Sequence, residues 1–428
     1  MNGAFSYPAR PWDRALIAAG EIERLARAAV RHLRSGRLRP AGATLSGRKI
    51  QHGAEITASP AELTGGSPIL YLPAIAWQYR FQRPQHLARA LARAGHPVLY
   101  VDGFLRSRLL PSRYLLQVEG DLHVLRLRVP GRPDPYREPL KPPATAALAA
   151  TILAGLRRER PLMVLVQLPF WAELGRELAR RLAVPLVYDR IDLHTGFPGV
   201  PAEIEAVEDR LLRDADLVCA TAAMLAERPP GASPRVLRLP NGVDLAAFPL
   251  HTEPRPVAGG QPCIGYVGAL GPWFDAEAVA AAARTLPGWR FRLAGRVEDP
   301  QIGSLAALPN VETVGEIPFP EVAPFLAGLD AALVPFRDLP LTRAVDPVKL
   351  YEALAMGLPV VARRLPETER WSEPLVYLYD RPEDFVRQLR RALAENTPDL
   401  ARRRRQAAEQ ESWDHRAAEL INAVSGLG

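Results

Sequence analysis

The sequence predicts an α/β protein built from two doubly wound, Rossmann-like domains. From residue 67 onward, short runs rich in Val, Leu and Ile alternate with segments of helical periodicity, which is the pattern of parallel sheets covered on both faces. A stretch rich in proline and glycine at residues 240–261 interrupts this alternation, and a second series of the same kind follows it. We therefore expect two domains that face each other across a cleft, where ligands of such sheets bind.

Length and composition agree with this class. A chain of 428 residues is long enough for two cores, and 48% apolar with 24% charged residues is typical of a globular protein. We find neither a run of about 18 apolar residues nor the apolar core of a signal peptide. The expected location is the cytoplasm, with peripheral contact at the inner membrane face left open.

Two cysteines and a basic net charge restrict the partners. Cys219 and Cys263 lie in separate apolar runs and predict buried thiols in a reducing compartment, without a disulfide framework or a zinc site. The net charge of +7 admits acidic partners such as nucleotides or anionic lipids. Because arginine has replaced lysine almost everywhere, we attribute the basic charge mainly to genome composition and expect no nucleic-acid partner.

Residues 1–66 form an extension before the first strand that we predict. Apolar residues recur there at helical spacing among several arginines, which indicates a basic amphipathic helix. Such a helix could lie on an anionic membrane or pack on the body of the protein. The apolar positions are Leu16, Ile22, Leu25, Ala29 and Leu33.

The first Rossmann-like domain is predicted at residues 67–239. Its helical segments include FQRPQHLARALARAG, which begins at Phe81. We expect its strands at residues 68–73, 96–102, 122–128, 161–168, 185–189, 216–221 and 235–240.

The second Rossmann-like domain is predicted at residues 262–381. Residues 382–428 are rich in Ala, Arg and Leu, and we expect them to form helices that pack across the outside of the domains. The strands of this domain are expected at residues 263–270, 289–295, 311–315, 330–336, 358–362 and 375–379.

The segment DPVKLYEALAMG predicts a short helix with an anion at its start. Asp346 can cap this helix, Pro347 suits its first position and Gly357 can end it. Lys349 then lies near the third helical position, where a cation is unfavourable unless an anion such as a phosphate occupies the helix start. Glu352 shares the face of Lys349 and could accept hydrogen bonds from a ribose diol. The alternative is an ordinary Lys/Glu surface pair.

Several motifs together resemble the GT-B glycosyltransferases that are similar to glycosyltransferase family 4. DPVKLYEALAMGLPVVA resembles their donor-site signature, LPNGVDLAAF their interdomain segment, and IGYVGALGPWFDAEAV with WRFRLAGR the first strands of their donor domain. FQRPQHLA, VYDRIDLHTGF and EDRLLRDADLVCATAAML resemble the amino-terminal domain of a bacterial envelope-polysaccharide branch. The resemblance extends over most of residues 68–425.

The resemblance implies a donor site in the second domain. Lys349 would bind the diphosphate of a nucleotide sugar and Glu352 its ribose hydroxyls. The loop from Gly268 to Gly271 would present backbone N–H groups, and Arg296 would add a second cation. The alternatives are a strand-to-helix turn for the glycines and a solvated surface arginine.

One position departs from the family pattern. Many members carry an acidic residue that contacts the sugar, eight positions before the ribose-binding one, and this chain has Ala344 there. Asp346 could substitute for it, although helix capping is the simpler role. The missing acid places the identity of the transferred sugar in doubt.

The first domain offers candidates for the acceptor side. Trp77, Gln82 and Arg83 follow its first strand and are expected to face the cleft and bind an acceptor. His86 is a catalytic candidate, with the alternative of a packed histidine. Asp192, which with Asp189 follows another strand, could orient the acceptor hydroxyl or act as its base, with loop capping as the alternative.

No metal site is expected. Asp214 and Asp216 resemble a metal-binding DxD motif, but Asp216 opens a buried strand whereas a metal site needs an open loop. Charge on the leaving group would then be offset by Lys349 and helix N-termini. We expect no cofactor apart from a nucleotide-sugar co-substrate, UDP- or GDP-linked.

The function that we predict is transfer of a sugar from a nucleotide donor to an acceptor hydroxyl. Relatives imply retention of the anomeric configuration, and the acceptor would be a saccharide or a lipid-linked intermediate of the cell envelope. The alternatives are a nucleotide-sugar epimerase on the same fold and a non-catalytic binding or assembly protein, which Ala344 would suit. No phosphate-binding GxxxxGKS loop, GxGxxG fingerprint or Ser-His-Asp motif is present.

Overall fold

The computed structural model describes residues 50–52, 66–103, 113–129, 133–156, 160–197, 199–227, 235–250, 261–371 and 373–427. The chain forms two compact units, one of Met1–Arg80 with Gly95–Val184 and one of Phe81–Ala94 with Pro185–Gly428. The limits of these units differ from the expected limits of the two Rossmann-like domains. The expected domain limits stay a prediction. The expected amino-terminal amphipathic helix lies outside the described residues.

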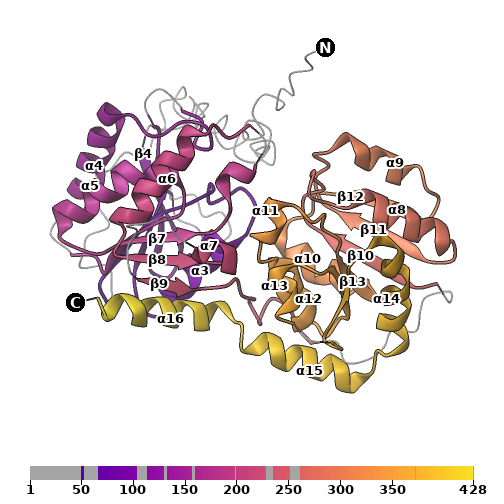
Figure 1. Cartoon of the computed structure of the whole chain (residues 1–428). Coiled ribbons are helices and arrows are strands. Elements are labelled where there is room, and N and C mark those ends of the chain that lie inside the picture. Colours follow the sequence, from indigo (N-terminus) through magenta and orange to yellow (C-terminus); the bar gives the residue numbers. More distant parts are fainter. Residues whose placement is uncertain are drawn as a thin grey trace, which may run out of the picture. The chain divides into compact units, whose positions relative to one another are not determined.

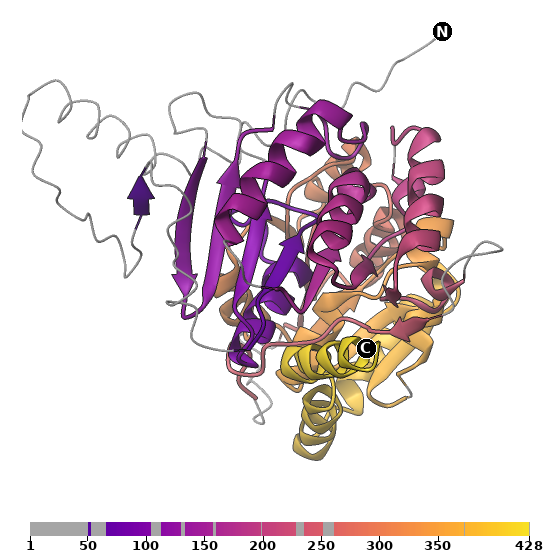
Figure 2. The ribbon, with the colours of Figure 1, turned by 90° about the vertical axis from the view of Figure 1, so that its left-hand side faces the viewer.

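The first unit contains a mostly parallel sheet in the order β1-β4-β5-β3-β2-β6, whose strands run side by side in Figure 2. Strands β5, β3, β2 and β6 are parallel neighbours and confirm the strands expected in this part of the chain. The antiparallel pair β1 and β4 at the edge was not predicted. The strands are β1 Ile50–His52, β2 Ile69–Leu72, β3 Val98–Asp102, β4 Arg113–Glu119, β5 Leu122–Leu127 and β6 Met163–Val166.

Helices α4 (Pro142–Leu156) and α5 (Ala172–Leu182) belong to the same unit and pack against each other. In the second unit, β7 (Leu186–Arg190), β8 (Leu217–Ala220) and β9 (Val236–Arg238) pair in parallel, as the sequence predicts. The same unit contains helices α3 (Arg83–Arg93), α6 (Glu203–Asp214) and α7 (Ala223–Ala226).

The second unit also holds a six-stranded parallel sheet in the order β12-β11-β10-β13-β14-β15. All six strands were predicted. The order reverses between β10 and β13, so the loops that follow these strands diverge and leave room for a ligand at the carboxyl edge. The strands are β10 Cys263–Val267, β11 Arg290–Ala294, β12 Val311–Gly315, β13 Ala331–Val334, β14 Val360–Arg363 and β15 Val376–Tyr379.

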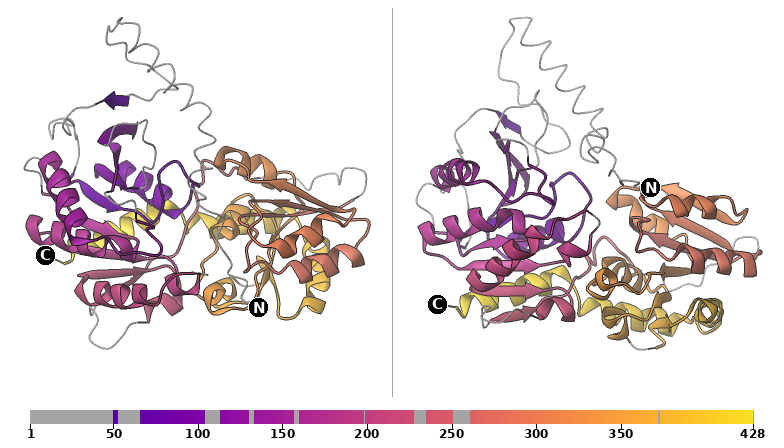
Figure 3. Two further views of the ribbon diagram at one scale, coloured as in Figure 1. Left: turned by 90° about the horizontal axis from the view of Figure 1, so that it is seen from above. Right: turned by 45° about the horizontal axis from the view of Figure 1, so that its top comes forward.

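Helices cover this sheet (Figure 1 and Figure 3). α14 (Pro382–Ala394) packs with β15 and α8 (Ala276–Thr285), while α12 (Val348–Ala355) contacts β13 and β14 and is covered by α15 (Pro398–Glu409). The last helix, α16 (Trp413–Ser425), packs against α3. The remaining helices are α9 Gly303–Ala306, α10 Phe319–Leu326, α11 Pro340–Arg343 and α13 Pro366–Glu369.

The core of the six-stranded sheet explains its uninterrupted apolar strands. Val360, Val361 and Ala362 of β14 are all fully buried, because a parallel strand with helices on both faces has no solvent side. Of the two cysteines, Cys219 is buried as expected, but Cys263 is only partly buried, since it opens its strand. Among the described residues no helix is both long and apolar enough to cross a membrane.

Gly295, which follows β11, tests this packing. A Cβ atom at Gly295 would lie 1.7 Å from the carbonyl oxygen of Gly268, and the backbone would have to move to admit it. We expect Gly295→Ala to lower the free energy of unfolding by at least about 2 kcal/mol, measured by urea unfolding. Gly288→Ala is the matched control, because no atom lies within 4 Å of a Cβ built there. Equal stability of both variants would contradict this account.

Candidate functional site

The loops that follow β10 and β11 are joined at the carboxyl edge of the six-stranded sheet. The Gly268 N–H donates to the Ala294 carbonyl at 2.8 Å, and the Leu270 N–H donates to the Arg296 carbonyl at 2.9 Å. Gly268 has φ +144°, a conformation that residues with a Cβ atom rarely adopt. The glycines expected in a phosphate-binding loop therefore allow a close backbone approach here.

Lys349 lies against this loop. A Cβ atom at Gly268 would be 2.8 Å from Cε and 3.1 Å from Nζ of Lys349. The Lys349 ammonium also lies 5.1 Å from the ring centre of Tyr266 and 5.0 Å from that of Phe336, distances at which an aromatic face attracts a cation. The structure thus brings together the lysine and the glycine loop that the sequence assigned to one site.

Helix α12 begins differently from the sequence prediction. Its first residue is Val348, its N-cap is Pro347, and no described side chain caps it. The expected cap by Asp346 is wrong, because the carboxylate of Asp346 is engaged elsewhere. Lys349 is consequently the second helical residue, closer to the helix start than expected, where it adds to the partial positive charge of the helix terminus.

Glu352 lies one turn after Lys349 and is 8% exposed. Burial raises the pKa of Glu352 to about 7, although the nearby Lys349 ammonium lowers it. Its carboxyl group is therefore protonated in part of the population at neutral pH. A buried carboxyl beside a cation can accept hydrogen bonds from a vicinal diol.

Arg296 has a partner that the sequence reading missed. Its guanidinium donates to Oε1 of Glu298 from Nε at 3.0 Å and from Nη2 at 2.5 Å. Part of the positive charge expected for a phosphate is thus already balanced. The i, i+2 spacing of Arg296 and Glu298 was visible in the sequence.

The position at which many family members carry an acidic residue has apolar surroundings in the structure. Ala344 is fully buried and packs with Ala220, Ala222 and Leu225. Asp346 does not fill this place, since its carboxylate accepts hydrogen bonds from the Asn241 N–H at 2.6 Å and from the Tyr351 hydroxyl at 2.7 Å. The predicted donor-binding role of Asp346 is not supported by these contacts.

Arg83 at the start of α3 is 4% exposed and fully engaged. It forms a bidentate ion pair with Asp189 at 2.7 and 3.0 Å. Its Nη1 also donates to the Pro240 carbonyl and to Oδ1 of Asn241. These contacts indicate that Arg83 organises the site, whereas Gln82, next to it, is exposed and its N–H is bonded to Oε1 of Gln85.

Asp192 follows β7 and is partly buried. Burial raises its pKa to about 7, against the lowering effect of Arg83. A carboxyl group with a pKa near neutrality can exchange a proton with an acceptor hydroxyl. This agrees with the predicted role of Asp192, which stays a prediction.

His86 is packed among aromatic rings. Its ring stacks on Trp413 at 5.2 Å and meets Phe81 and Phe319 edge-on at 4.5 and 5.0 Å. Burial, followed by the charges of Arg89 and Arg93, lowers its pKa to about 3. Because a neutral, enclosed imidazole of this basicity is a poor general base, the packing argues against the predicted catalytic role of His86.

Trp77, described within the first unit, is also buried. It is 6% exposed, its ring meets Tyr100 edge-on at 5.1 Å, and its backbone N–H donates to Oδ2 of Asp102 at 3.1 Å. These contacts favour a packing role over the predicted contact with an acceptor.

The Asp214 and Asp216 pair is placed as expected. Asp214 ends α6, and Asp216 precedes β8 and accepts a hydrogen bond from the Leu186 N–H at 2.8 Å. In the part of the chain that the structure describes, no three His, Cys, Asp or Glu side chains are grouped so as to hold a metal ion.

Two family profiles match the chain. Residues 261–395 match "Glycosyl transferases group 1" and residues 82–242 match "Glycosyl transferase 4-like domain". A Bacillus subtilis protein named as a teichuronic acid biosynthesis glycosyltransferase, TuaH, is 29% identical over 226 residues, which is 49% of this chain and 57% of TuaH. The match thus spans little more than half of that relative.

Solved structures share the fold. Sucrose-phosphate synthase from Thermosynechococcus elongatus has a TM-score of 0.67 at 18% identity, over 85% of this chain and 99% of that one. Anabaena HepE in complex with UDP-glucose has a TM-score of 0.58 at 17% identity, over 84% and 100%. The fold is GT-B, with two Rossmann-like domains. The chain belongs to the GT-B glycosyltransferases that resemble glycosyltransferase family 4.

The pH dependence of stability should report the buried carboxyl of Glu352. Its pKa is raised from 4.5 to about 7 on folding. The contribution of this carboxyl group to the free energy of unfolding is therefore complete below pH 4.5 and is lost as the pH rises through 7. Because Glu352→Gln stays neutral, we expect it to exceed the wild type in free energy of unfolding by about 1–3 kcal/mol at pH 8. Urea unfolding at several pH values measures this difference.

The difference should shrink as the pH falls to 4.5 and vanish below it, where the carboxyl is protonated in both states. The control is Glu383→Gln, which alters an exposed glutamate on α14. A pH-independent difference for Glu352→Gln would contradict the raised pKa.

Proposed function

We propose that this protein transfers a sugar from a UDP- or GDP-linked donor to an acceptor hydroxyl, with retention of configuration and without a metal ion. The observation that carries the proposal is the placement of Lys349 against the Gly268 loop, with Glu352 one helical turn away. HepE, which shares the fold, is named in complex with UDP-glucose. The similarity to TuaH supports a role in synthesis of a cell-envelope polysaccharide.

The donor would lie at the carboxyl edge of the six-stranded sheet. The diphosphate would contact the Lys349 ammonium and the uncapped start of α12, where partial positive charge favours an anion. Negative charge develops on this leaving group as the glycosidic bond breaks, and fixed positive charges stabilise it. Glu352 would accept hydrogen bonds from the ribose hydroxyls.

The acceptor hydroxyl would approach Asp192. With a pKa of about 7, the carboxylate of Asp192 can take a proton at neutral pH. Arg83, held by Asp189, lowers this pKa and so keeps part of the Asp192 population ionised. A lipid-linked acceptor and contact with a membrane through residues 1–66 belong to the same proposal and depend on residues outside the described ones.

A screen of UDP- and GDP-sugars tests the reaction. Transfer to an added saccharide or lipid-linked acceptor, with the anomeric configuration followed by NMR, would support the proposal. Isomerised nucleotide sugar without an acceptor would identify an epimerase. Nucleotide binding without any turnover would identify a non-catalytic binding protein.

Lys349→Ala should weaken UDP or GDP binding about ten- to hundredfold, because a charge-assisted contact with the diphosphate is lost. Isothermal titration calorimetry measures this change. Lys141→Ala, at the exposed approach to α4, is the matched control. Unchanged affinity in Lys349→Ala would show that this helix does not bind the nucleotide.

A chelator should leave the transfer rate unchanged, because Lys349 and the start of α12 supply the positive charge that a metal ion supplies in other enzymes. The measurement compares initial rates with and without EDTA. Loss of activity with EDTA and its return with manganese would contradict metal independence.

A further inference from the structure

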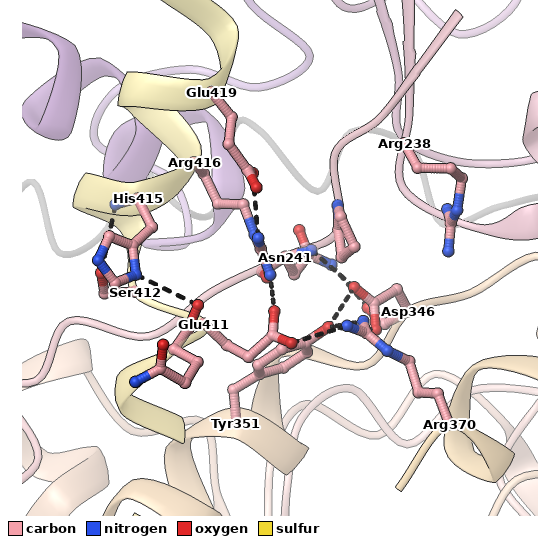
Figure 4. Close-up of polar contacts among 12 residues, drawn as sticks. Arg238, Asn241, Asp346, Tyr351, Arg370, Glu411, Ser412, His415, Arg416 and Glu419 are labelled. Atoms are coloured by element: carbon pink, nitrogen blue, oxygen red, sulfur yellow. Dashed lines mark hydrogen bonds and ion pairs between the residues drawn. The ribbon is translucent and has the colours of Figure 1, made fainter. Parts of the chain in front are cut away.

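Six residues from distant parts of the second unit form a closed ring of hydrogen bonds and ion pairs beside helix α12 (Figure 4). The ring joins the segment after β9, the approach to α12, α12 itself, the end of α13 and the region where α15 meets α16. Its members are Asn241, Asp346, Tyr351, Arg370, Glu411 and Arg416.

Asp346 is fixed by both its side chain and its backbone. Its carboxylate, 4% exposed, accepts from the Asn241 N–H at 2.6 Å and from the Tyr351 hydroxyl at 2.7 and 2.8 Å. The Asn241 side chain donates from Nδ2 to the Asp346 carbonyl at 2.6 Å. Two segments more than 100 residues apart are therefore held by short contacts on one residue.

The remaining contacts close the ring. Arg370 donates from Nη1 to the Tyr351 hydroxyl at 2.7 Å and from Nη2 to Oε1 of Glu411 at 2.9 Å. Glu411 forms an ion pair with Arg416, and Arg416 donates from Nε to the Asn241 carbonyl at 3.2 Å. Burial, followed by the charge of Asp346, raises the pKa of Tyr351 well above its usual value, so its hydroxyl remains a donor.

The ring lies on a different side of α12 from Lys349. Asp346 comes two residues before the first helical residue, and Tyr351 is the fourth residue of α12. Successive helical residues are about 100° apart, so Tyr351 is turned about 160° away from Lys349, whereas Lys349 and Glu352 share a face. The ring thus holds the first turn of α12 on the side of Tyr351, while Lys349 and Glu352 lie on another face of the helix.

We propose that Asn241, Asp346 and Tyr351 are positioning residues of the donor site, which set the first turn of α12 and through it the places of Lys349 and Glu352. The inference rests on the proposed function, since it assigns the ring to diphosphate binding. Because α12 has no side-chain cap among the described residues, the ring supplies the polar side-chain contacts at the start of this helix. Loss of these contacts would let the first turn shift slightly, and a small displacement of a charged group weakens an ionic contact.

Tyr351→Phe tests the proposal. The substitution removes the hydroxyl that joins Asp346 to Arg370. It keeps the aromatic side chain, which packs edge-on against Trp371 at 5.4 Å. We expect UDP or GDP affinity to fall about three- to tenfold, the scale of one or two lost hydrogen bonds. Tyr379→Phe is the matched control, since among the described residues the buried Tyr379 hydroxyl has no hydrogen-bond partner, and its affinity should match the wild type.

A double-mutant cycle separates positioning from a general loss of stability. If Tyr351 acts through Lys349, Tyr351→Phe should weaken binding less than twofold in a Lys349→Ala background. Equal losses in both backgrounds, or full affinity in Tyr351→Phe alone, would overturn the positioning role.

Failure of the proposed function has a different signature, which the wild-type protein alone reveals: it would bind neither UDP nor GDP, or it would bind them without transferring a sugar. If Tyr351→Phe does not fold, Asn241→Ala takes its place in the cycle. It removes the Nδ2 contact to Asp346 and the Oδ1 contact from Arg83, while the Asn241 N–H contact to Asp346 remains. The same non-additivity with Lys349→Ala is expected.

Discussion

The close approach of two backbone segments, at Gly268 and Gly295, is the constraint on which the proposed donor site depends. Only a residue without a Cβ atom at position 295 allows the loop after β10 to lie on the loop after β11 at the observed distance. The Lys349 side chain can then lie across Gly268, where any larger residue would displace its ammonium group.

The strands of the sheets could be predicted from the sequence because a buried parallel strand is a short, uninterrupted run of apolar residues. Val360, Val361 and Ala362 are apolar without interruption, and no distant residue is needed to recognise such a strand. Strand β4 reads RYLLQVE and pairs at an edge in antiparallel fashion. That mixed pattern is ambiguous in sequence, so the strand was missed.

The sequence could anticipate the relative placement of candidate site residues only where it follows from local spacing. Lys349 and Glu352 share a helix, and their relation follows from helical geometry alone. The roles expected for Asp346 and His86 changed because their partners are remote in sequence. Asn241 lies 105 positions before Asp346, and Trp413, which stacks on His86, belongs to the last helix. A single sequence does not reveal which distant residues meet.

The buried positive charges of the second unit are carried mainly by arginine side chains. A guanidinium group has several donors in a rigid fork, so one side chain can serve several acceptors at once. Arg83 does this with Asp189, Pro240 and Asn241, and the buried Arg416 does it with Asn241, Glu411 and Glu419. Such groups are costly to bury unless every donor is matched, which explains why these arginines occur in networks instead of single pairs.

The predominance of arginine has a further consequence for Lys349. The chain has three lysines, at 49, 141 and 349, and only Lys349 falls within Phe81–Ala94 or Pro185–Gly428. Guanidinium groups are inert toward mild acylating reagents, whose acyl carbon is attacked by unprotonated amines with loss of the leaving group. The ε-amino group of Lys349 is therefore the single amine in the second unit open to such chemistry, a natural attachment point for a label at the edge of its six-stranded sheet.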